Sequence, residues 1–130
     1  MKNDSFYKLP KRLFFDERYK HLSISAKVLY ALLLDRKALS IKNNWIDVNG
    51  NYYLYFTNSE AKKILNCGNE KISKLFKELE AVNLILRKRH GLRKPNIIYV
   101  YRIWNLIIKF QEFRLSNTNK NDDSKTRDYY

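Results

Sequence analysis

Apolar and polar positions follow the period of an α-helix in residues 70–82. Four apolar residues recur at positions i, i+3, i+4 and i+7, on one face of a helix: Ile72, Leu75, Phe76 and Leu79. The opposite face is polar and carries Glu70, Ser73, Lys74 and Lys77, with Lys71 on its flank. Asn69 can cap this helix. The pattern predicts an amphipathic helix that buries one face and exposes the other.

A short helix is predicted immediately before it. Thr57 and Glu60 have the spacing of a capping box, in which the hydroxyl caps the helix and the carboxylate reaches back. We expect this helix over residues 58–66, ending at Asn66-Cys67-Gly68. The glycine-containing turn then joins the two helices, which is typical of a helix-turn-helix.

A longer helix is predicted nearer the N-terminus. Ser23 or Ser25 can cap it, and we expect it to run to about Arg36. Its middle, AKVLYALLLDR, is apolar on most sides. Such a helix is usually buried at the centre of a small domain.

Two pairs of strand-like runs are present. Residues 45–56 favour β-structure on both sides of Asn49-Gly50, which is a strong hairpin signal because both turn positions need positive φ. Residues 84–89 and 97–102 predict a second hairpin, whose turn contains a glycine and a proline. This second hairpin follows the helix-turn-helix directly, as the wing of a winged helix would.

The two ends of the chain have weaker patterns. Pro10 argues against helix in residues 1–22, so we expect an extended arm there. Its aromatic residues should tuck onto the domain: Phe6, Tyr7, Phe14 and Phe15. Residues 103–115 predict a last helix, and residues 116–130 a polar disordered tail or the start of a linker. We therefore expect one domain over residues 1–115.

Composition bears on partners more than on fold. The chain has 130 residues, 45% of them hydrophobic and 30% charged, which suits one globular domain. Lys and Arg number 26 against 13 Asp and Glu, a net charge of +13. Such an excess of positive charge favours a polyanionic partner.

The same sequence excludes several kinds of site. Its three glycines lie too far apart for a phosphate-binding loop, and there is no GxSxG nucleophile motif. His21, His90 and the single Cys67 do not have the spacing of a metal site. The longest apolar run, Val28–Leu34, is much shorter than the roughly 20 residues of a membrane span. We expect a cytoplasmic protein with no catalytic activity, metal, cofactor or membrane contact.

Several stretches together resemble one family, the plasmid replication initiator protein A family, in its N-terminal (RepA N-terminal type) domain. The stretches are FYKLPKRLF (6–14), YKHLSISAKVLYALLLDRKALSIKNNWID (19–47), TNSEAKKILN (57–66) and KLFKELEAVNLILRKRHGLRKPNIIYV (74–100). The family is found on plasmids of low-GC Gram-positive bacteria. The resemblance covers about residues 5–103.

The resemblance implies an α+β winged-helix domain with an extra N-terminal β-hairpin and an extended arm. Such initiators bind repeated double-stranded sites (iterons) in a plasmid replication origin, start replication and, as homodimers, contribute to copy control. They recruit the host replication machinery, partly through a C-terminal domain that we expect this chain to lack. Carried onto this chain, the recognition helix is Asn69–Ala81 and the wing is Arg87–Asn96.

The expected DNA contacts are polar or basic residues on three segments. They are Lys8, Lys11 and Arg12 on the arm, Asn69, Lys71, Ser73, Lys74 and Lys77 on the helix, and Arg87, Lys88, Arg89, Arg93 and Lys94 on the wing. Basic side chains neutralise phosphates, and a helix in the major groove reaches base edges. A winged-helix transcription regulator would use the same contacts. A protein-interaction module would instead turn this basic face toward an acidic partner.

Overall fold

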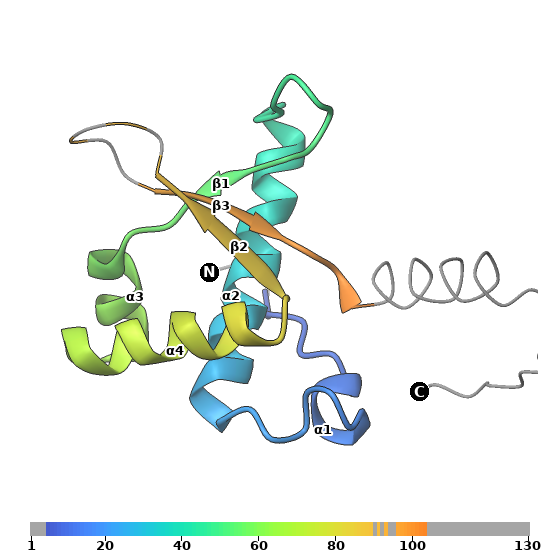
Figure 1. Cartoon of the computed structure of the whole chain (residues 1–130), viewed down its shortest axis with the longest axis vertical. Helices are drawn as coiled ribbons and strands as arrows, with labels where there is room; N and C mark the ends of the chain where they lie inside the picture. Colours follow the sequence, from blue (N-terminus) through green and yellow to red (C-terminus); the bar gives the residue numbers. More distant parts are fainter. Residues whose placement is uncertain (1–4, 90, 92, 94–95, 104–130) are drawn as a thin grey trace, which may run out of the picture.

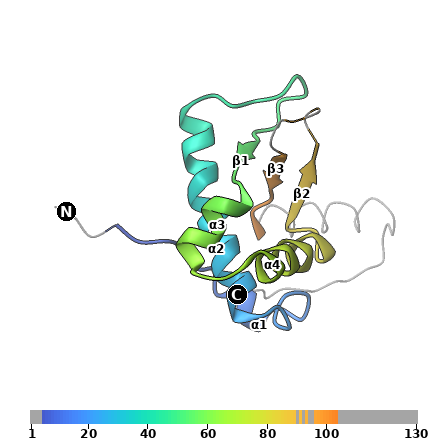
Figure 2. The same ribbon diagram turned by 90° about the vertical axis from the view of Figure 1, so that its left-hand side faces the viewer.

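The structure, a computed structural model, describes residues 5–89, 91, 93 and 96–103. Along these residues the elements are α1 (Arg12–Phe15), α2 (Ile24–Lys42), β1 (Leu54–Tyr55), α3 (Asn58–Leu65), α4 (Asn69–Ala81), β2 (Ile85–Lys88) and β3 (Ile97–Val100). The sheet stands beside the second half of α2 and above α4 (Figures 1 and 2). Helices combined with a small antiparallel sheet confirm the predicted α+β winged-helix class.

Helix α2 lies at the centre and is longer than predicted. Its N-cap is Ser23, whose hydroxyl accepts a hydrogen bond from the Ala26 amide at 3.1 Å. The helix continues past Arg36 to Lys42, so the predicted end was too early. Two of the added residues contact β3 or the residue just before β1: Lys37 Nζ donates to the Val100 carbonyl at 2.6 Å, and Ser40 Oγ to the Tyr53 carbonyl at 2.7 Å. These tertiary contacts stabilise the extension.

Strand β3 is the central strand of the sheet. The order is β1-β3-β2, and both pairings are antiparallel. All four residues of β3 are buried. β2 and β3 form the predicted second hairpin, whereas β1 comes from far earlier in the chain and pairs Leu54 with Ile98.

The predicted hairpin over residues 45–56 forms only in part. Its two sides share a single antiparallel bridge, between Ile46 and Tyr52. The turn is closed by the Asp47 carboxylate, which accepts hydrogen bonds from the amides of Asn49 and Asn51 at 2.9 Å each. Beyond this bridge the second side continues into β1, which pairs with β3 and not with the first side of the hairpin.

Helices α3 and α4 form the predicted helix-turn-helix. The capping box is confirmed: the Thr57 hydroxyl accepts from the Glu60 amide, and the Glu60 carboxylate accepts from the Thr57 amide, at 3.1 Å each. The turn passes through Asn66 in the left-handed region, at φ 55°. The N-cap of α4 is Gly68 and not Asn69, whose side chain makes no capping bond. Glycine is also tolerated at this position.

The apolar stripe predicted for α4 is confirmed. All four of its residues are buried: Ile72, Leu75, Phe76 and Leu79. They join a core formed with α2 and the inner face of the sheet. The amphipathic pattern therefore determined which side of α4 faces outward.

The arm differs from the prediction in two ways. It is not extended throughout, because residues 12–15 form α1. Pro10 stands before the first turn, where its missing amide is harmless, and its carbonyl accepts from the Leu13 amide at 3.1 Å. The arm's aromatic residues also stay exposed, Phe6 by 79% and Phe15 by 58%, whereas Leu13 is fully buried. Leu13 therefore anchors the arm.

The predicted C-terminal elements fall beyond the described residues. Of the helix expected over residues 103–115, only Ile103 is described, and its side chain is buried in the core. The tail over residues 116–130 lies outside the described part altogether. Within the described part, none of the helices combines the length and hydrophobicity that crossing a membrane needs.

Candidate nucleic-acid interface

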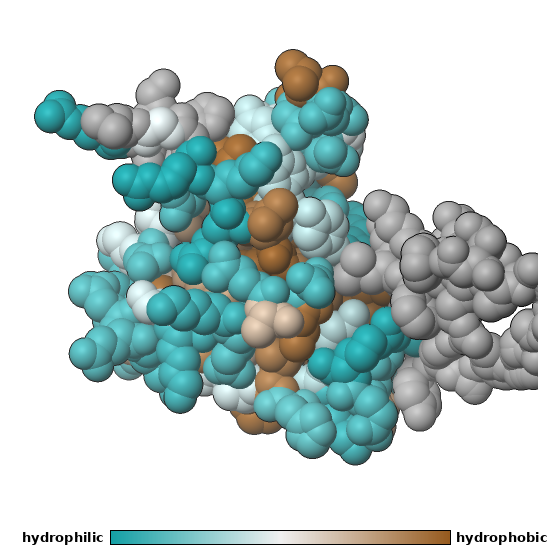
Figure 3. All heavy atoms as spheres, in the orientation of Figure 1, coloured by the Kyte–Doolittle hydropathy of each residue, from teal (hydrophilic) through white to brown (hydrophobic). Residues whose placement is uncertain are grey.

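The outward face of α4 brings together the polar residues that the sequence placed on it. Five of them line one shallow hollow: Asn69, Glu70, Ser73, Lys74 and Lys77. Ser73 is half-buried and the other four are exposed, as is Lys71 beside them. The surface over α3 and α4 is largely hydrophilic (Figure 3). Such a face can meet base edges and phosphates in a major groove.

Two hydrogen bonds connect the second half of α4 to the start of α2. The Glu78 carboxylate accepts one hydrogen bond from the Ser23 amide at 2.8 Å and another from the Ser23 hydroxyl at 2.9 Å. Ser23 is also the N-cap of α2, so one residue connects the starting turn of α2 to α4. Because α4 packs its apolar stripe on the same core, its outward face has a defined orientation.

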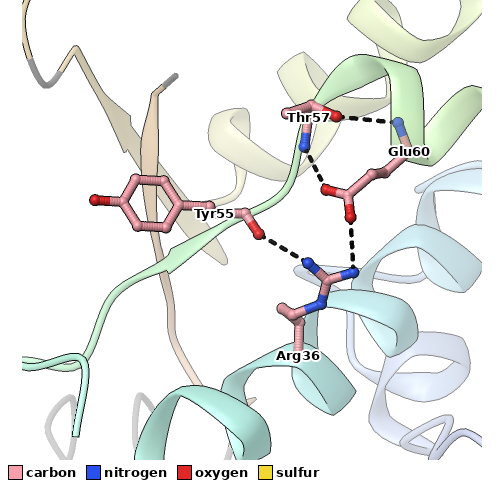
Figure 4. A network of polar contacts seen from close by, with 4 residues as sticks. All are labelled: Arg36, Tyr55, Thr57 and Glu60. Atoms are coloured by element: carbon pink, nitrogen blue, oxygen red, sulfur yellow. Dashed lines mark hydrogen bonds and ion pairs between the residues drawn. The ribbon is translucent and has the colours of Figure 1, made fainter. Parts of the chain in front are cut away.

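Helix α3 is oriented by Arg36 of α2 (Figure 4). The Arg36 guanidinium donates to the Tyr55 carbonyl at 3.0 Å and to the Glu60 carboxylate at 3.1 Å, and lies 4.9 Å from the centre of the Phe56 ring. Partial burial raises the pKa of Glu60, but hydrogen bonds from Thr57 and Arg36 outweigh this and leave that pKa below its usual value. One guanidinium thus joins β1 to the start of the helix-turn-helix.

The wing carries exposed cations on the same side of the molecule as α3 (Figure 1). Lys88, Arg89 and Arg93 are exposed, and Arg93 adopts a left-handed conformation at φ 63°. Lys94, also predicted as a contact, lies outside the described residues. This arrangement suits neutralisation of phosphates beside a helix lying in a groove.

Arg87 is placed differently from the other wing cations. Its guanidinium donates to both carboxylate oxygens of Glu80, at 3.0 Å each, and lies 4.7 Å from the centre of the Phe76 ring. Only 21% of its side chain is exposed. Arg87 therefore points from the wing toward α4, and its charge is already paired within the protein.

The arm residues lie apart from the α4 hollow. Lys8 lines another cavity beside α2, together with Asp35 and Arg102. Lys11 is exposed, and Arg12 is half-buried in α1. The structure therefore brings together the predicted residues of α4, sets the wing on the side of α3, and leaves the arm at a separate surface.

Two candidate contacts were missed by sequence reasoning. Lys62 and Lys63 of α3 line a hollow with Ser59, Asn66 and Cys67, beside the helix-helix turn. Ser59, Lys62, Lys63 and Asn66 follow the spacing i, i+3, i+4, i+7, so helical periodicity applied to α3 could have found this face. These lysines place two further positive charges on the helix-turn-helix, beside its turn.

Proteins of similar sequence and structure are known. A 41 kDa protein of Lactobacillus helveticus is 33% identical over 91 residues, covering 70% of this chain and 26% of that protein. The chain therefore spans about a quarter of that relative's length. The family model of the replication initiator protein A (RepA) N-terminus matches residues 5–112.

Three solved structures share the fold. One is described as "N-Terminal domain of DNA binding protein", with 41% identity and a TM-score of 0.66 over 84% of this chain and 88% of that one. "Structure of Rep-DNA complex" has the same identity and TM-score over 84% and 89%. "Structure of MDR initiator" has 43% identity and a TM-score of 0.65 over 82% and 90%. Since the family model also matches most of its length, the chain belongs to the family of the replication initiator protein A N-terminus.

Proposed function

We propose that this chain binds double-stranded DNA sequence-specifically at repeated sites of a plasmid replication origin, and so takes part in starting plasmid replication. The observation that carries the proposal is that the fold exposes both the polar face of α4 and a wing rich in cations. Membership of the initiator family supports it. A structural neighbour with 41% identity, described as a Rep-DNA complex, supports it further.

In this proposal α4 enters the major groove and the wing follows the backbone. Ser73 and Lys74 face base edges, and Lys71 and Lys77 lie near phosphates. On the wing, Lys88, Arg89, Arg93 and Lys94 contact phosphates or the adjacent minor groove. Arg87 holds the wing against α4 through Glu80 and makes no DNA contact of its own.

The arm has a weaker part in this proposal. Lys8, Lys11 and Arg12 contact the backbone only if the DNA extends past α1, because Lys8 lies at a separate cavity. The binding itself needs no catalytic step, metal or cofactor.

We further propose that two copies bind adjacent repeats as a homodimer and that this pairing contributes to copy control. Recruitment of host replication proteins is proposed for the whole initiator and not assigned to these residues. Sedimentation at several concentrations tests the dimer. A single monomeric species over the whole range, with and without a two-repeat duplex, would contradict it.

The main test is a selection of bound duplexes from a random pool at about 150 mM salt, where weak electrostatic binding is suppressed. The expected result is one recovered motif that recurs in a plasmid origin. That origin should support replication of its plasmid only when the protein is present. A motif found only at promoters would favour a transcription regulator. No motif above background would overturn DNA recognition and favour an acidic protein partner.

A further inference from the structure

Glu70 stands out among the acidic residues that the structure describes. Six of these eight have a partner for the side chain: Asp16 with Arg18, Glu17 with Lys20, Asp47 with Tyr99, Glu60 with Arg36, Glu78 with Ser23, and Glu80 with Arg87. In the described part, only the carboxylates of Asp35 and Glu70 make no hydrogen bond or ion pair, and both residues are exposed. Glu70 is therefore an uncompensated negative charge on the surface proposed to meet DNA.

Its position on α4 is that of a base-reading residue. Glu70 is the second residue of the helix and lines the same hollow as Ser73 and Lys74. In helix-turn-helix proteins the N-terminal residues of the recognition helix contact the base edges, while the first helix of the motif crosses the backbone. Glu70 thus lies where side chains contact base edges.

A carboxylate at this position distinguishes bases because it carries negative charge and cannot donate a hydrogen bond. It repels every phosphate near it, so it weakens binding to duplex DNA in general. An ionised carboxylate only accepts hydrogen bonds, and the donors in the major groove are the amino groups of cytosine N4 and adenine N6. In adenine the acceptor N7 lies beside the N6 donor, and N7 repels the second carboxylate oxygen because both atoms only accept hydrogen bonds. Cytosine therefore fits a carboxylate better than adenine does.

A purely structural role for Glu70 makes a different prediction. An acidic residue in the first turn stabilises a helix through the helix dipole. Lys74, one turn later, could also pair with it, yet no salt bridge forms between them within the described residues. If the dipole were its whole role, replacing Glu70 would change stability and leave base preference intact.

We propose that Glu70 is a specificity-determining residue, accepting a hydrogen bond from the N4 amino group of one cytosine in each DNA site. This inference rests on the proposed DNA-binding function and adds one chemical requirement to it. Cytosine compensates the carboxylate best, adenine compensates it less well because of its N7 acceptor, and guanine and thymine offer it no donor in the major groove. Glu70 therefore rejects wrong sites, whereas the neighbouring lysines attract all DNA.

The test compares selections from a random duplex pool by the full chain, Glu70→Gln, Glu70→Ala and the control Asp35→Asn. We expect one cytosine of the wild-type motif to become adenine with Glu70→Gln, because an amide both donates to N7 and accepts from N6. Glu70→Ala should lose preference there by on the order of tenfold. Both Glu70 variants should bind an unrelated duplex more tightly than wild type, and Asp35→Asn should match wild type throughout.

The outcomes distinguish a failure of this inference from a failure of the proposed DNA-binding function on which it rests. If wild type and both Glu70 variants select the same motif with the same cytosine preference, the inference is overturned and DNA recognition stands. If wild type selects no motif, DNA recognition fails and the inference fails with it. Glu70→Gln keeps the size of the side chain, so it provides the comparison even where Glu70→Ala unfolds at a lower temperature.

Discussion

The guanidinium of Arg87 in β2 forms two parallel hydrogen bonds with the carboxylate of Glu80 in α4, both at 3.0 Å. It covers the ring of Phe76, whose side chain belongs to the buried stripe of α4. The wing and α4 are therefore joined by an ion pair within the protein. This pair links the two elements proposed to meet DNA.

Replacing Arg87 by methionine should lower the free energy of unfolding by about 1–3 kcal/mol, because Glu80 would keep a half-buried charge without its partner. Urea denaturation measures this. The matched control is Arg89→Met, an exposed residue of the same wing, which should change the free energy of unfolding by less than about 0.5 kcal/mol. Equal losses from both variants would contradict a special role for Arg87.

The Ser23–Glu78 contact should contribute to stability as a coupled pair. Ser23→Ala removes the cap of α2 and should cost about 1 kcal/mol in free energy of unfolding. Together with Glu78→Ala, a double-mutant cycle should give a coupling of about 0.5–1.5 kcal/mol, because the Ser23 hydroxyl donates one of the two hydrogen bonds to Glu78 and Ser23→Ala leaves only the bond from the amide. Strictly additive losses would show that the two residues act independently.

Acid should weaken the attachment of α3. The pKa of Glu60 is below its usual value in the folded chain. The stability that ionised Glu60 contributes is therefore present above its pKa in the unfolded chain, and it is lost as the pH falls through its pKa in the folded chain. The free energy of unfolding, measured by urea denaturation between pH 6 and pH 3, should therefore fall less in Glu60→Gln than in wild type. An identical pH dependence in the two proteins would rule out a contribution from Glu60.

Arg89 should contribute to DNA affinity without contributing to sequence preference. Arg89→Ala should weaken binding to every duplex and reduce the slope of log affinity against log salt by about one, as loss of one phosphate contact does. The control is Lys42→Ala at the C-terminal end of α2, far along that helix from the Ser23 contact with α4. A loss confined to the specific site would instead place Arg89 against a base.

Local patterns in the sequence predicted several features correctly. The capping box at Thr57 and Glu60 joins residues three apart, and the apolar stripe of α4 repeats within two turns. Both depend on interactions between near neighbours in the chain. The polar residues of the candidate site on α4 followed from the same periodicity, because burying one helix face exposes the other.

Features that depend on distant residues could not be predicted in this way. The extension of α2 to Lys42 is stabilised by contacts with Tyr53 and Val100. Because β1 pairs with β3, the predicted first hairpin keeps only the bridge between Ile46 and Tyr52. In the candidate site, only the fold showed that Arg87 is paired with Glu80 while Glu70 makes no hydrogen bond or ion pair with the residues that the structure describes.

By itself, therefore, the sequence determined the helix-turn-helix, the wing strands and the positive charge of the chain. The tertiary structure alone decided which charges remain available to a partner. The reason is physical: a helix period or a capping box is set within a few residues, whereas charges such as Glu78 are compensated by groups 55 residues away. Those pairings form only when the core brings distant segments together.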